Sequence, residues 1–331
     1  MNSIQKPDCA WSLKDLAEVP QNGLTVMSTF ACGGGSSMGY KRAGCTIAAA
    51  NDIDPEMAWH YQHNLHPPTY LLCPIGDLLT RDLPSELFNL DILDGSPPCS
   101  TFSMAGSRED AWGKKKHFRE GQASQVLSDL FFDYLNLVGR LRPRVAIAEN
   151  VKGMILGNAK GYTKLVMQRF REIGYRPQLF LLNAADCGVP QRRERVFFVA
   201  IRDDITAPPL KLAPKHRWIS AGEAVGDLRD DLAKWEMVTA SNQRHTLAGR
   251  TKPWPFTQPS PTLTSGSSKE LIDTQKRFGD FTFADYKRLG SFPDDYHAKT
   301  DKIGKYMIGM SVPPKMTEQV ARAVIQQWLQ P

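Results

Sequence analysis

Residues 24–35 read LTVMSTFACGGG, an apolar run that ends in three consecutive glycines. The run as far as Phe30 has the length and apolar character of a buried β-strand. Glycines have no Cβ, so the backbone can turn sharply after the strand. A helix is predicted over residues 36–43, with Gly44 as its C-terminal cap. A strand, a glycine turn and a helix in this order are typical of α/β sheets that bind nucleotides.

Strand-like and helix-like segments alternate along the first 200 residues. A second strand is predicted at 46–50, and Asp54 is placed to cap a helix that begins at Pro55, where a missing amide proton costs nothing. Apolar side chains recur at three- and four-residue steps over 126–141, which indicates a long amphipathic helix. The other predicted elements are a helix at 164–173 and strands at 90–93, 145–148, 179–182 and 196–201. This alternation predicts an α/β fold with a doubly wound, Rossmann-like sheet.

The character of the sequence changes after about Asp203. Prolines interrupt any helical period, notably at 253–256 and 259–261, which indicates a smaller, loop-rich domain over residues 203–280. A helical pattern returns from Phe283. Thr317 is placed to cap a last helix over residues 318–329, whose apolar side chains fall on one face.

Composition and cysteine usage exclude several classes of protein. The chain has 331 residues, 41% hydrophobic and 23% charged, as in ordinary globular proteins. It contains no apolar run of membrane-span length, and residues 1–20 lack the apolar stretch of a secretion signal, so we expect a cytoplasmic protein. The six cysteines form no C-x-x-C pair, which favours reduced, buried thiols. His60, His63 and His66 lack a further ligand at a suitable spacing, so no metal is predicted.

The positive charge of the chain is confined to its second half. Residues 1–150 have a net charge of −4, whereas the remainder has a net charge of +10 and the whole chain +6. A basic half favours a polyanionic partner such as nucleic acid. On charge alone, a solvated basic surface is an equally good interpretation.

An acidic residue follows the glycine turn at the spacing of a nucleotide site. Asp52 lies 18 positions beyond Gly34, at the tip of the second predicted strand, where a carboxylate can bind both hydroxyls of a ribose. With the backbone amides of the turn, it predicts a cofactor site at the carboxyl end of the first strand. The glycine turn alone fits an ordinary strand-to-helix corner equally well. No G-K-[ST] sequence is present, which excludes a phosphate-binding P-loop.

A cysteine follows two prolines at the end of another predicted strand. Residues 94–100 read DGSPPCS, and the prolines stiffen the backbone before Cys99, at the sheet edge where α/β enzymes hold reacting groups. Cys99 is therefore a candidate nucleophile, and a buried structural thiol is the alternative. The next strands bring Glu149 to the same edge and place Arg193 and Arg195 nearby.

Short motifs in a fixed order make the chain similar to one known family. They are FA at 30–31, ND at 51–52, GD at 76–77, SPPC at 96–99, LFFD at 130–133, ENV at 149–151, QRRER at 191–195, GSFPD at 290–294 and GMSV at 309–312. In this order they resemble the DNA (cytosine-5)-methyltransferase family over residues 24–328. The resemblance implies a Rossmann-like methyltransferase sheet in a catalytic domain at 1–202, a target-recognition domain at 203–280, and a return segment at 281–331 that completes the catalytic domain.

The resemblance implies a role for each candidate catalytic residue. Cys99 would add to carbon 6 of a cytosine, which makes carbon 5 nucleophilic enough to accept a methyl group. Glu149 would bind the exocyclic amine and ring N3. Arg195 would hold the cytosine O2, with Arg193 as a neighbouring support. No metal is required for this chemistry.

The cofactor implied by the resemblance is S-adenosylmethionine. Phe30 corresponds to the residue that packs on the adenine, Asp52 to the ribose ligand with Ile53 as its apolar neighbour, and Asp77 to the acceptor for the adenine amine. Other residues implied for this pocket are Gly34, Gly35, Pro98, Leu130, Ser311 and Val312.

The partner implied by the resemblance is double-stranded DNA, whose target nucleotide must be flipped out of the helix. We expect a monomer. The segment 100–120 corresponds to a mobile loop, and its expected DNA contacts are Ser100, Arg108, Lys114, Lys115, Lys116 and Arg119. In the smaller domain, the candidate DNA-binding residues are Arg217, Gln243, Arg244, Arg250, Thr262 and Leu263.

Three residues depart from the family pattern, and two rival functions share the fold. Ser100 stands where glutamine is commoner, Cys32 where a glycine is usual, and Met310 where asparagine is usual. The rivals are a tRNA cytosine-5 methyltransferase, whose Cys-Phe-Thr signature is absent, and a catalytically silent DNA-binding subunit. An intact Cys99 and Glu149 argue against the silent subunit.

Overall fold

The computed structural model describes residues 9–98, 115–116, 125–126, 130–157, 159–229, 235–238, 253–265, 271–273 and 278–330. Its first strand, glycine turn and helix confirm the prediction. Strand β1 (Thr25–Thr29) leads through the turn into helix α2 (Gly35–Arg42), and Gly44 follows with a φ of +87°. Strand β2 (Thr46–Asp52) and helix α3 (Pro55–Leu65) come next, and the Asp54 side chain caps α3 as predicted.

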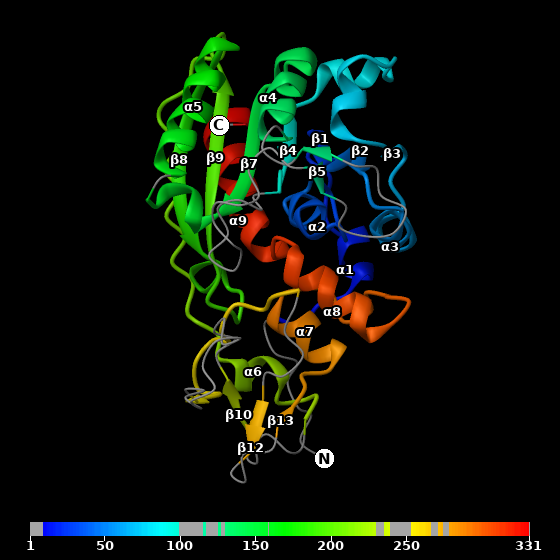
Figure 1. The fold of residues 1–331 in the computed structure, drawn as a ribbon, viewed down its shortest axis with the longest axis vertical. Coiled ribbons are helices and arrows are strands. Elements are labelled where there is room, and N and C mark those ends of the chain that lie inside the picture. The colour runs from blue at the N-terminus through cyan, green and yellow to red at the C-terminus, as the bar shows by residue number, and fades with distance from the viewer. Residues whose placement is uncertain are drawn as a thin grey trace.

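The large sheet has seven strands in the order β3-β2-β1-β4-β7-β9-β8 (Figure 1). Strands β1, β2, β3, β4 and β7 are parallel, whereas β9 runs antiparallel to both β7 and β8. The further bounds are β3 (Tyr70–Leu72), β4 (Ile92–Gly95), β7 (Val145–Val151), β8 (Tyr175–Asn183) and β9 (Glu194–Arg202). This topology confirms the Rossmann-like methyltransferase fold. Because the five parallel strands share one direction, their carboxyl ends meet at one edge of the sheet.

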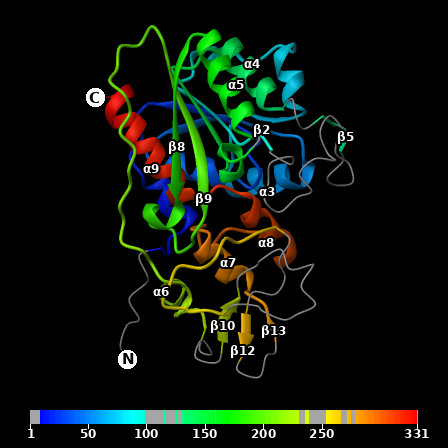
Figure 2. The ribbon, with the colours of Figure 1, turned by 60° about the vertical axis from the view of Figure 1, so that its left-hand side comes forward.

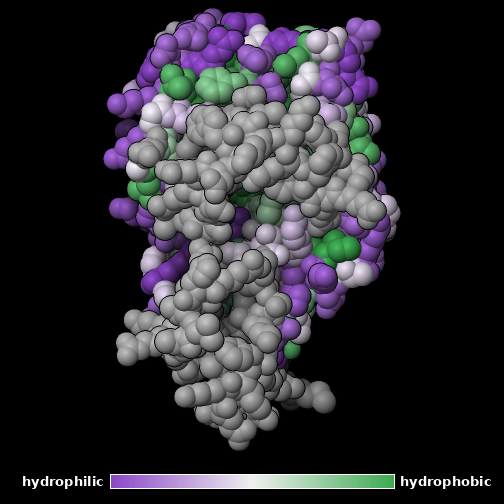
Figure 3. Space-filling model, viewed as in Figure 1, coloured by the Kyte–Doolittle hydropathy of each residue, from purple (hydrophilic) through white to green (hydrophobic). Residues whose placement is uncertain are grey.

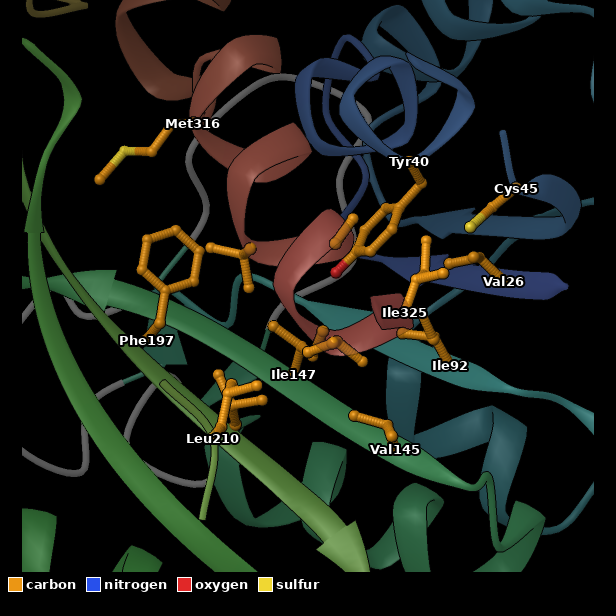
Figure 4. Packing of buried hydrophobic residues seen from close by; sticks show 14 of the residues in the cluster. Val26, Tyr40, Cys45, Ile92, Val145, Ile147, Phe197, Leu210, Met316 and Ile325 are labelled. Carbon is orange, nitrogen blue, oxygen red and sulfur yellow. The ribbon is translucent and has the colours of Figure 1, made fainter. Parts of the chain in front are cut away.

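Helices cover both faces of this sheet (Figure 2). One face is covered by α2, by α9 (Pro314–Val324) and by the π-helical turn that follows it (Ile325–Leu329). Leu210 packs into the same hydrophobic cluster. Figure 4 shows Tyr40 reaching from α2 into this cluster beside Ile325. On the other face lie α4 (Leu130–Leu141), α5 (Ala159–Glu172) and the 3-10 helices Ile75–Leu79 and Ser85–Asn89.

A smaller part of the molecule lies at the end farthest from α4 and α5 (Figure 1). It contains helix α6 (Ala221–Val225) and an antiparallel sheet of β10 (Trp235–Val238), β11 (Pro253–Trp254), β12 (Leu271–Asp273) and β13 (Phe278–Gly279). Helices α7 (Phe283–Leu289) and α8 (Asp301–Met310) join it to the larger part. A third core packs α6, α7 and α8 against α3 and Trp11, which precedes helix α1 (Leu13–Ala17).

Three sequence predictions about helices were wrong at their first residues. Helix α5 begins at Ala159, five residues before the predicted start at 164. Val126 lies in the short strand β6 (Gln125–Val126), which pairs with β5 (Lys115–Lys116), so the predicted helix does not include Val126; the described helix α4 covers Leu130–Leu141. The last helix begins at Pro314 rather than after Thr317. A proline is favourable as the first helical residue because it has no N–H to leave unpaired. The Thr317 hydroxyl is consequently buried within the helix, and none of the described residues is its hydrogen-bond partner.

Glycine allows α2 and α9 to touch. A Cβ built on Gly39 would lie 2.5 Å from the Pro314 carbonyl oxygen and 2.9 Å from the Glu318 nitrogen, so the two backbones would have to separate. We expect Gly39→Ala to lower the free energy of unfolding by about 1–3 kcal/mol. Gly161→Ala in α5 is the matched control because a Cβ there meets nothing within 4 Å. The control should raise stability by about 0.5–1 kcal/mol. Denaturant unfolding measures both changes, and equal effects would contradict the close contact.

Candidate active site

A pocket lies at the carboxyl edge of the sheet, where β1, β2 and β4 end. The predicted cofactor residues that line it are Phe30, Gly35, Asp52, Ile53, Pro98, Ser311 and Val312. Three others do not line it: Gly34 packs under the turn against Leu65, Asp77 is exposed in a 3-10 helix, and Leu130 is buried at the start of α4. The structure therefore gathers seven of the ten residues in one pocket.

Asp52 is held in a fixed orientation at this pocket. It is the last residue of β2, and its carboxylate accepts hydrogen bonds from the backbone N–H of Cys32 at 2.8 Å and of Asp54 at 3.0 Å. Burial raises the pKa of Asp52, and the backbone hydrogen bonds partly offset that rise. A carboxylate fixed by two N–H donors has capacity left to accept further hydrogen bonds, as two ribose hydroxyls require.

The carboxyl-terminal part of the chain closes the pocket over the glycine turn. A Cβ on Gly35 would lie 2.2 Å from the Val312 carbonyl oxygen, so glycine is required for this approach. Phe30 and Cys32 have positive φ angles of 52° and 47°, which curl the backbone between strand and helix. An aromatic ring, a fixed carboxylate and the N-terminus of α2 together fit a nucleoside cofactor that also carries an amino-acid chain.

Cys32 is an inert thiol in this wall. Its sulfur lies 3.7 Å from the Ser311 hydroxyl oxygen and 3.7 Å from the Met57 sulfur. Burial, with a further contribution from the charge of Asp52, raises the pKa of Cys32 to about 12, so the thiol stays protonated near neutral pH. Met310 also lines the pocket, and its side chain is 53% exposed.

A buried ion pair lies beside the pocket. The Arg195 Nε atom is 2.9 Å from the Glu149 Oε1 atom, and Glu149 is 8% exposed. Burial raises the pKa of Glu149, whereas the charges of Arg195 and Arg193 lower it. Arg193 is 3% exposed and donates to the carbonyl oxygens of Gly309 and Leu263. Arg193, which immediately precedes β9, thus joins the start of this strand to both α8 and the smaller part of the molecule.

The proline segment connects the ion pair to the pocket. Ser96 and Pro98 line the pocket, and the Ser96 side chain is hydrogen-bonded to Glu149. The Asn150 side-chain amide donates to the Pro97 carbonyl oxygen at 2.9 Å, which fixes the segment against β7. Cys99 follows Pro98 directly in the sequence and lies outside the described residues.

Most predicted DNA-binding residues also lie outside the part that the structure describes: Ser100, Arg108, Lys114, Arg119, Gln243, Arg244 and Arg250. For Lys115 and Lys116, only the backbone of β5 is described. Arg217 is exposed and paired with Glu223 at 2.6 Å.

Two residues predicted to bind DNA have a different environment. The Thr262 hydroxyl donates to the Arg192 carbonyl oxygen, and Leu263 is only 1% exposed. The Arg192 guanidinium lies between the rings of Trp218 and Trp254, 4.7 and 4.9 Å from their centroids. In the described structure, Thr262 and Leu263 therefore pack against the QRRER segment and connect the smaller part of the molecule to it.

Eight residues that line the pocket were not among the predicted cofactor residues: Ala31, Cys32, Ser36, Asp54, Met57, Ser96, Tyr306 and Met310. Ser36 directly follows the glycine turn and Ser96 begins the SPPC motif, so both lie in or beside motifs that the sequence analysis had singled out. Met57 and Tyr306 reach the pocket from α3 and α8, and no local pattern marks them. His60 accepts a hydrogen bond from the Lys299 N–H, as a structural histidine does.

Neither a metal site nor a membrane span is found in the described ranges. Within them, no group of three or more His, Cys, Asp or Glu side chains is arranged to hold a metal ion. No helix among the same residues has the length and apolar character needed to cross a membrane. Figure 3 shows that the described surface on one face is largely hydrophilic, with hydrophobic residues in small, separate patches.

The comparisons with known proteins agree with this geometry. The family model described as C-5 cytosine-specific DNA methylase matches residues 24–248. The Type II methyltransferase M.FnuDI of Fusobacterium nucleatum is 32% identical over 215 residues, which cover 63% of this chain and 56% of that protein. The chain thus spans little more than half the length of this relative.

Two further comparisons extend over nearly the whole chain. The Type II methyltransferase M.MthTI of Methanothermobacter thermautotrophicus is 27% identical over 339 residues, covering 91% of this chain and 97% of that protein. The crystal structure of the S. pombe Dnmt2 methyltransferase has a similar fold, with a TM-score of 0.63 at 18% identity, over 92% of this chain and 98% of that chain. The chain belongs to the C-5 cytosine-specific DNA methylase family, whose members use S-adenosylmethionine.

Proposed function

We propose that this chain methylates carbon 5 of a flipped-out cytosine in double-stranded DNA. The observation that carries the proposal is that Ser96 lines the cofactor-type pocket and is also hydrogen-bonded to Glu149. A methyl donor in the pocket and a base held by Glu149 would therefore meet at the segment that leads to Cys99. When bound, S-adenosylmethionine supplies a methyl group on a sulfonium centre.

The chain's own residues would activate the base in two coupled steps. The Cys99 thiolate adds to carbon 6 while Glu149 donates a proton to ring N3, which directs an electron pair to carbon 5. A free thiol has a pKa of about 8.5, and the nearby arginine charges would favour the thiolate. After methyl transfer, a water molecule would take the carbon 5 proton; the electron pair of that C–H bond re-forms the double bond between carbons 5 and 6, the thiolate leaves carbon 6, and the aromatic ring is restored. The proton on N3 then returns to Glu149.

The arginines would orient the base. Arg195 would hold the cytosine O2 while it is paired with Glu149. Arg193 would act indirectly, since both of its terminal nitrogens are bound to backbone carbonyl oxygens. Flipping the nucleotide costs a few kcal/mol, which contacts with the DNA backbone would have to offset.

Trapping of a covalent adduct tests the proposal. In 5-fluorocytosine, carbon 5 carries fluorine in place of the proton that must be lost before the thiolate can leave. A duplex containing 5-fluorocytosine should therefore form a denaturation-resistant adduct with the wild-type protein and S-adenosylmethionine. Cys99→Ala should form none, because the thiolate is gone. Cys187→Ala is the matched control, because Cys187 is a buried cysteine of the core that contains α9, and this variant should still form the adduct.

Three outcomes would contradict the proposal. An adduct with Cys99→Ala would exclude the mechanism, and an adduct with 5-fluorocytosine tRNA but not with the duplex would identify the tRNA-modifying alternative. Binding of DNA without any adduct would identify a silent subunit.

A further inference from the structure

Two tryptophan rings hold the side chain of Arg192 where the smaller part of the molecule meets the large sheet. The Cζ atom of its guanidinium is 4.7 Å from the ring centroid of Trp218 and 4.9 Å from that of Trp254. Its Nε atom is buried, and none of the described residues accepts a hydrogen bond from it. A cation over an indole face is attracted by the charge of the ring, and more strongly where water is excluded. We call these three residues the Arg192 cluster.

The two rings of the Arg192 cluster are anchored to different parts of the molecule. The Trp218 Nε1–H donates to the Asp186 carboxylate at 2.7 Å, and Asp186 lies in a 3-10 helix directly after β8. The Trp254 Nε1–H donates to the Pro259 carbonyl oxygen at 3.0 Å, within the smaller part. Arg192 therefore bridges a ring that is fixed to the large sheet and a ring that is fixed to the smaller part.

Backbone hydrogen bonds join the same two parts. The Arg192 N–H donates to the Ser260 carbonyl oxygen at 2.8 Å, and the Ser260 N–H donates to the Pro190 carbonyl oxygen at 2.9 Å. The Gln191 side chain, which is 1% exposed, accepts from the Leu263 N–H at 3.1 Å. The segment that precedes β9 is therefore a joint between the large sheet and the smaller part.

The joint leads directly into the catalytic ion pair. The extended pairing of β9 continues back to Arg193, whose carbonyl oxygen accepts from the Ala184 N–H at 2.9 Å. Alternate residues of an extended chain face opposite sides, so Arg193 and Arg195 share one face and Arg192 lies on the other. Arg195 faces Glu149 at 2.9 Å. Arg192 consequently points away from the base that Glu149 would hold, and it can act on the reaction only through the position of this segment.

We propose that Arg192 is a positioning residue that fixes the smaller part of the molecule against the start of β9. DNA held by the smaller part would then present its flipped cytosine to Glu149 and Arg195 in the correct place. Without the cation between the rings, the smaller part can shift at the joint, and a displacement of about 1 Å at the reacting atoms can cost about 10²-fold in rate. This inference rests on the proposed function.

Methyl transfer by Arg192→Met tests this role. Methionine is long enough to keep apolar contact with the rings, but it has no charge. We expect the single-turnover rate, at saturating duplex DNA and S-adenosylmethionine, to fall by about 10–100-fold. Arg192→Lys restores the charge and should recover part of the rate, and no recovery would contradict a role of the cation. A merely structural role would lower the unfolding temperature and leave the rate of the folded protein unchanged.

Arg42→Met is the matched control. Arg42 is the last residue of α2, and its Cζ atom is 4.8 Å from the ring centroid of Trp11. Arg42 is also paired with Glu318 at 2.6 Å, so the substitution removes the same kind of contact and an ion pair in addition. At a temperature where both variants are folded, Arg42→Met should transfer methyl groups at the wild-type rate. Equal slowing of the two variants would assign the effect to lost stability and overturn the positioning role.

Trp218→Leu provides a second variant if Arg192→Met fails to fold. Trp218 is 40% exposed, so its replacement disturbs little of the core, and removal of one ring should also slow methyl transfer. Where both single variants fold, the double variant should be no slower than Arg192→Met, because both changes break the same contact. Losses of rate that multiply would show that the two residues act separately.

A direct contact between Arg192 and a DNA phosphate is the alternative. Loss of such a contact would weaken DNA binding and reduce the slope of log Kd against log salt concentration by about one, while the rate at saturating DNA would stay unchanged. That result would overturn the positioning role.

The outcomes also separate this inference from the proposed function. A wild-type protein that traps no fluorocytosine adduct would overturn the proposed function, and this inference with it. A wild-type protein that methylates DNA, with Arg192→Met and Trp218→Leu at the same rate, would overturn the role of Arg192 alone.

Discussion

Replacing Glu149 with glutamine is expected to slow methyl transfer by about 10²–10⁴-fold, the usual contribution of a positioned general acid. Glutamine has nearly the same shape and can still bind the exocyclic amine of cytosine, but it has no acidic proton to give to ring N3. The loss should therefore appear in the rate of the chemical step, measured in single-turnover experiments with labelled S-adenosylmethionine and unmethylated duplex DNA.

The control for this prediction is binding. Affinity of Glu149→Gln for the duplex, measured without the methyl donor, should stay within a few-fold of wild type because the contacts to phosphates are unchanged. A rate within tenfold of the wild type would show that Glu149 does not supply the proton. A parallel loss of DNA affinity would show that its main role is to bind the base.

Replacing Arg195 with methionine is expected to lower the free energy of unfolding by about 3–5 kcal/mol, because it leaves a buried carboxylate without its partner. The Glu149 and Arg195 side chains are only 11% and 14% exposed, so water cannot take over the lost contact. Arg169→Met is the matched control. Arg169 and Glu172 form an exposed pair at 3.3 Å, and its loss should cost less than about 1 kcal/mol.

The destabilisation of Arg195→Met should depend on pH in a defined direction. Burial already raises the pKa of Glu149, and loss of Arg195 raises it further. A carboxyl whose folded-state pKa lies above its unfolded-state value stabilises the fold less as the pH rises between the two values. The stability difference from wild type should therefore be larger at pH 8 than at pH 5, as denaturant unfolding can measure. The double variant with Glu149→Gln should recover part of the loss, and no recovery would contradict direct coupling.

Local motifs determined much of the fold and part of the site. The apolar run and glycines at 24–35 predicted β1, the turn and α2, and Asp54 with Pro55 predicted the start of α3. Each of these features depends on residues within a few positions of one another. Asp52, which the sequence put at the tip of the second strand, lines the pocket, since the end of a parallel strand defines the sheet edge.

Long-range packing decided what the sequence left open. The sequence marked Leu263 as a DNA contact, yet it is buried and its carbonyl oxygen holds Arg193, 70 positions away. No sequence pattern distinguished Asp94 from other residues at strand ends. Only the fold brings Ser28 and Tyr40 into hydrogen-bonding contact with it, from 66 and 54 positions away.

The sequence by itself therefore determined the strands, the turns and the motifs that identify the family. Backbone hydrogen bonding and hydrophobic periodicity are set by nearby residues, which makes these features readable along the chain. Burial and the neighbouring charges were decided by the tertiary structure alone, because they depend on segments far apart in the chain. Since desolvation and adjacent charges set the pKa of a carboxyl group, only the folded chain could distinguish Asp94 and Glu149 from its other acidic residues.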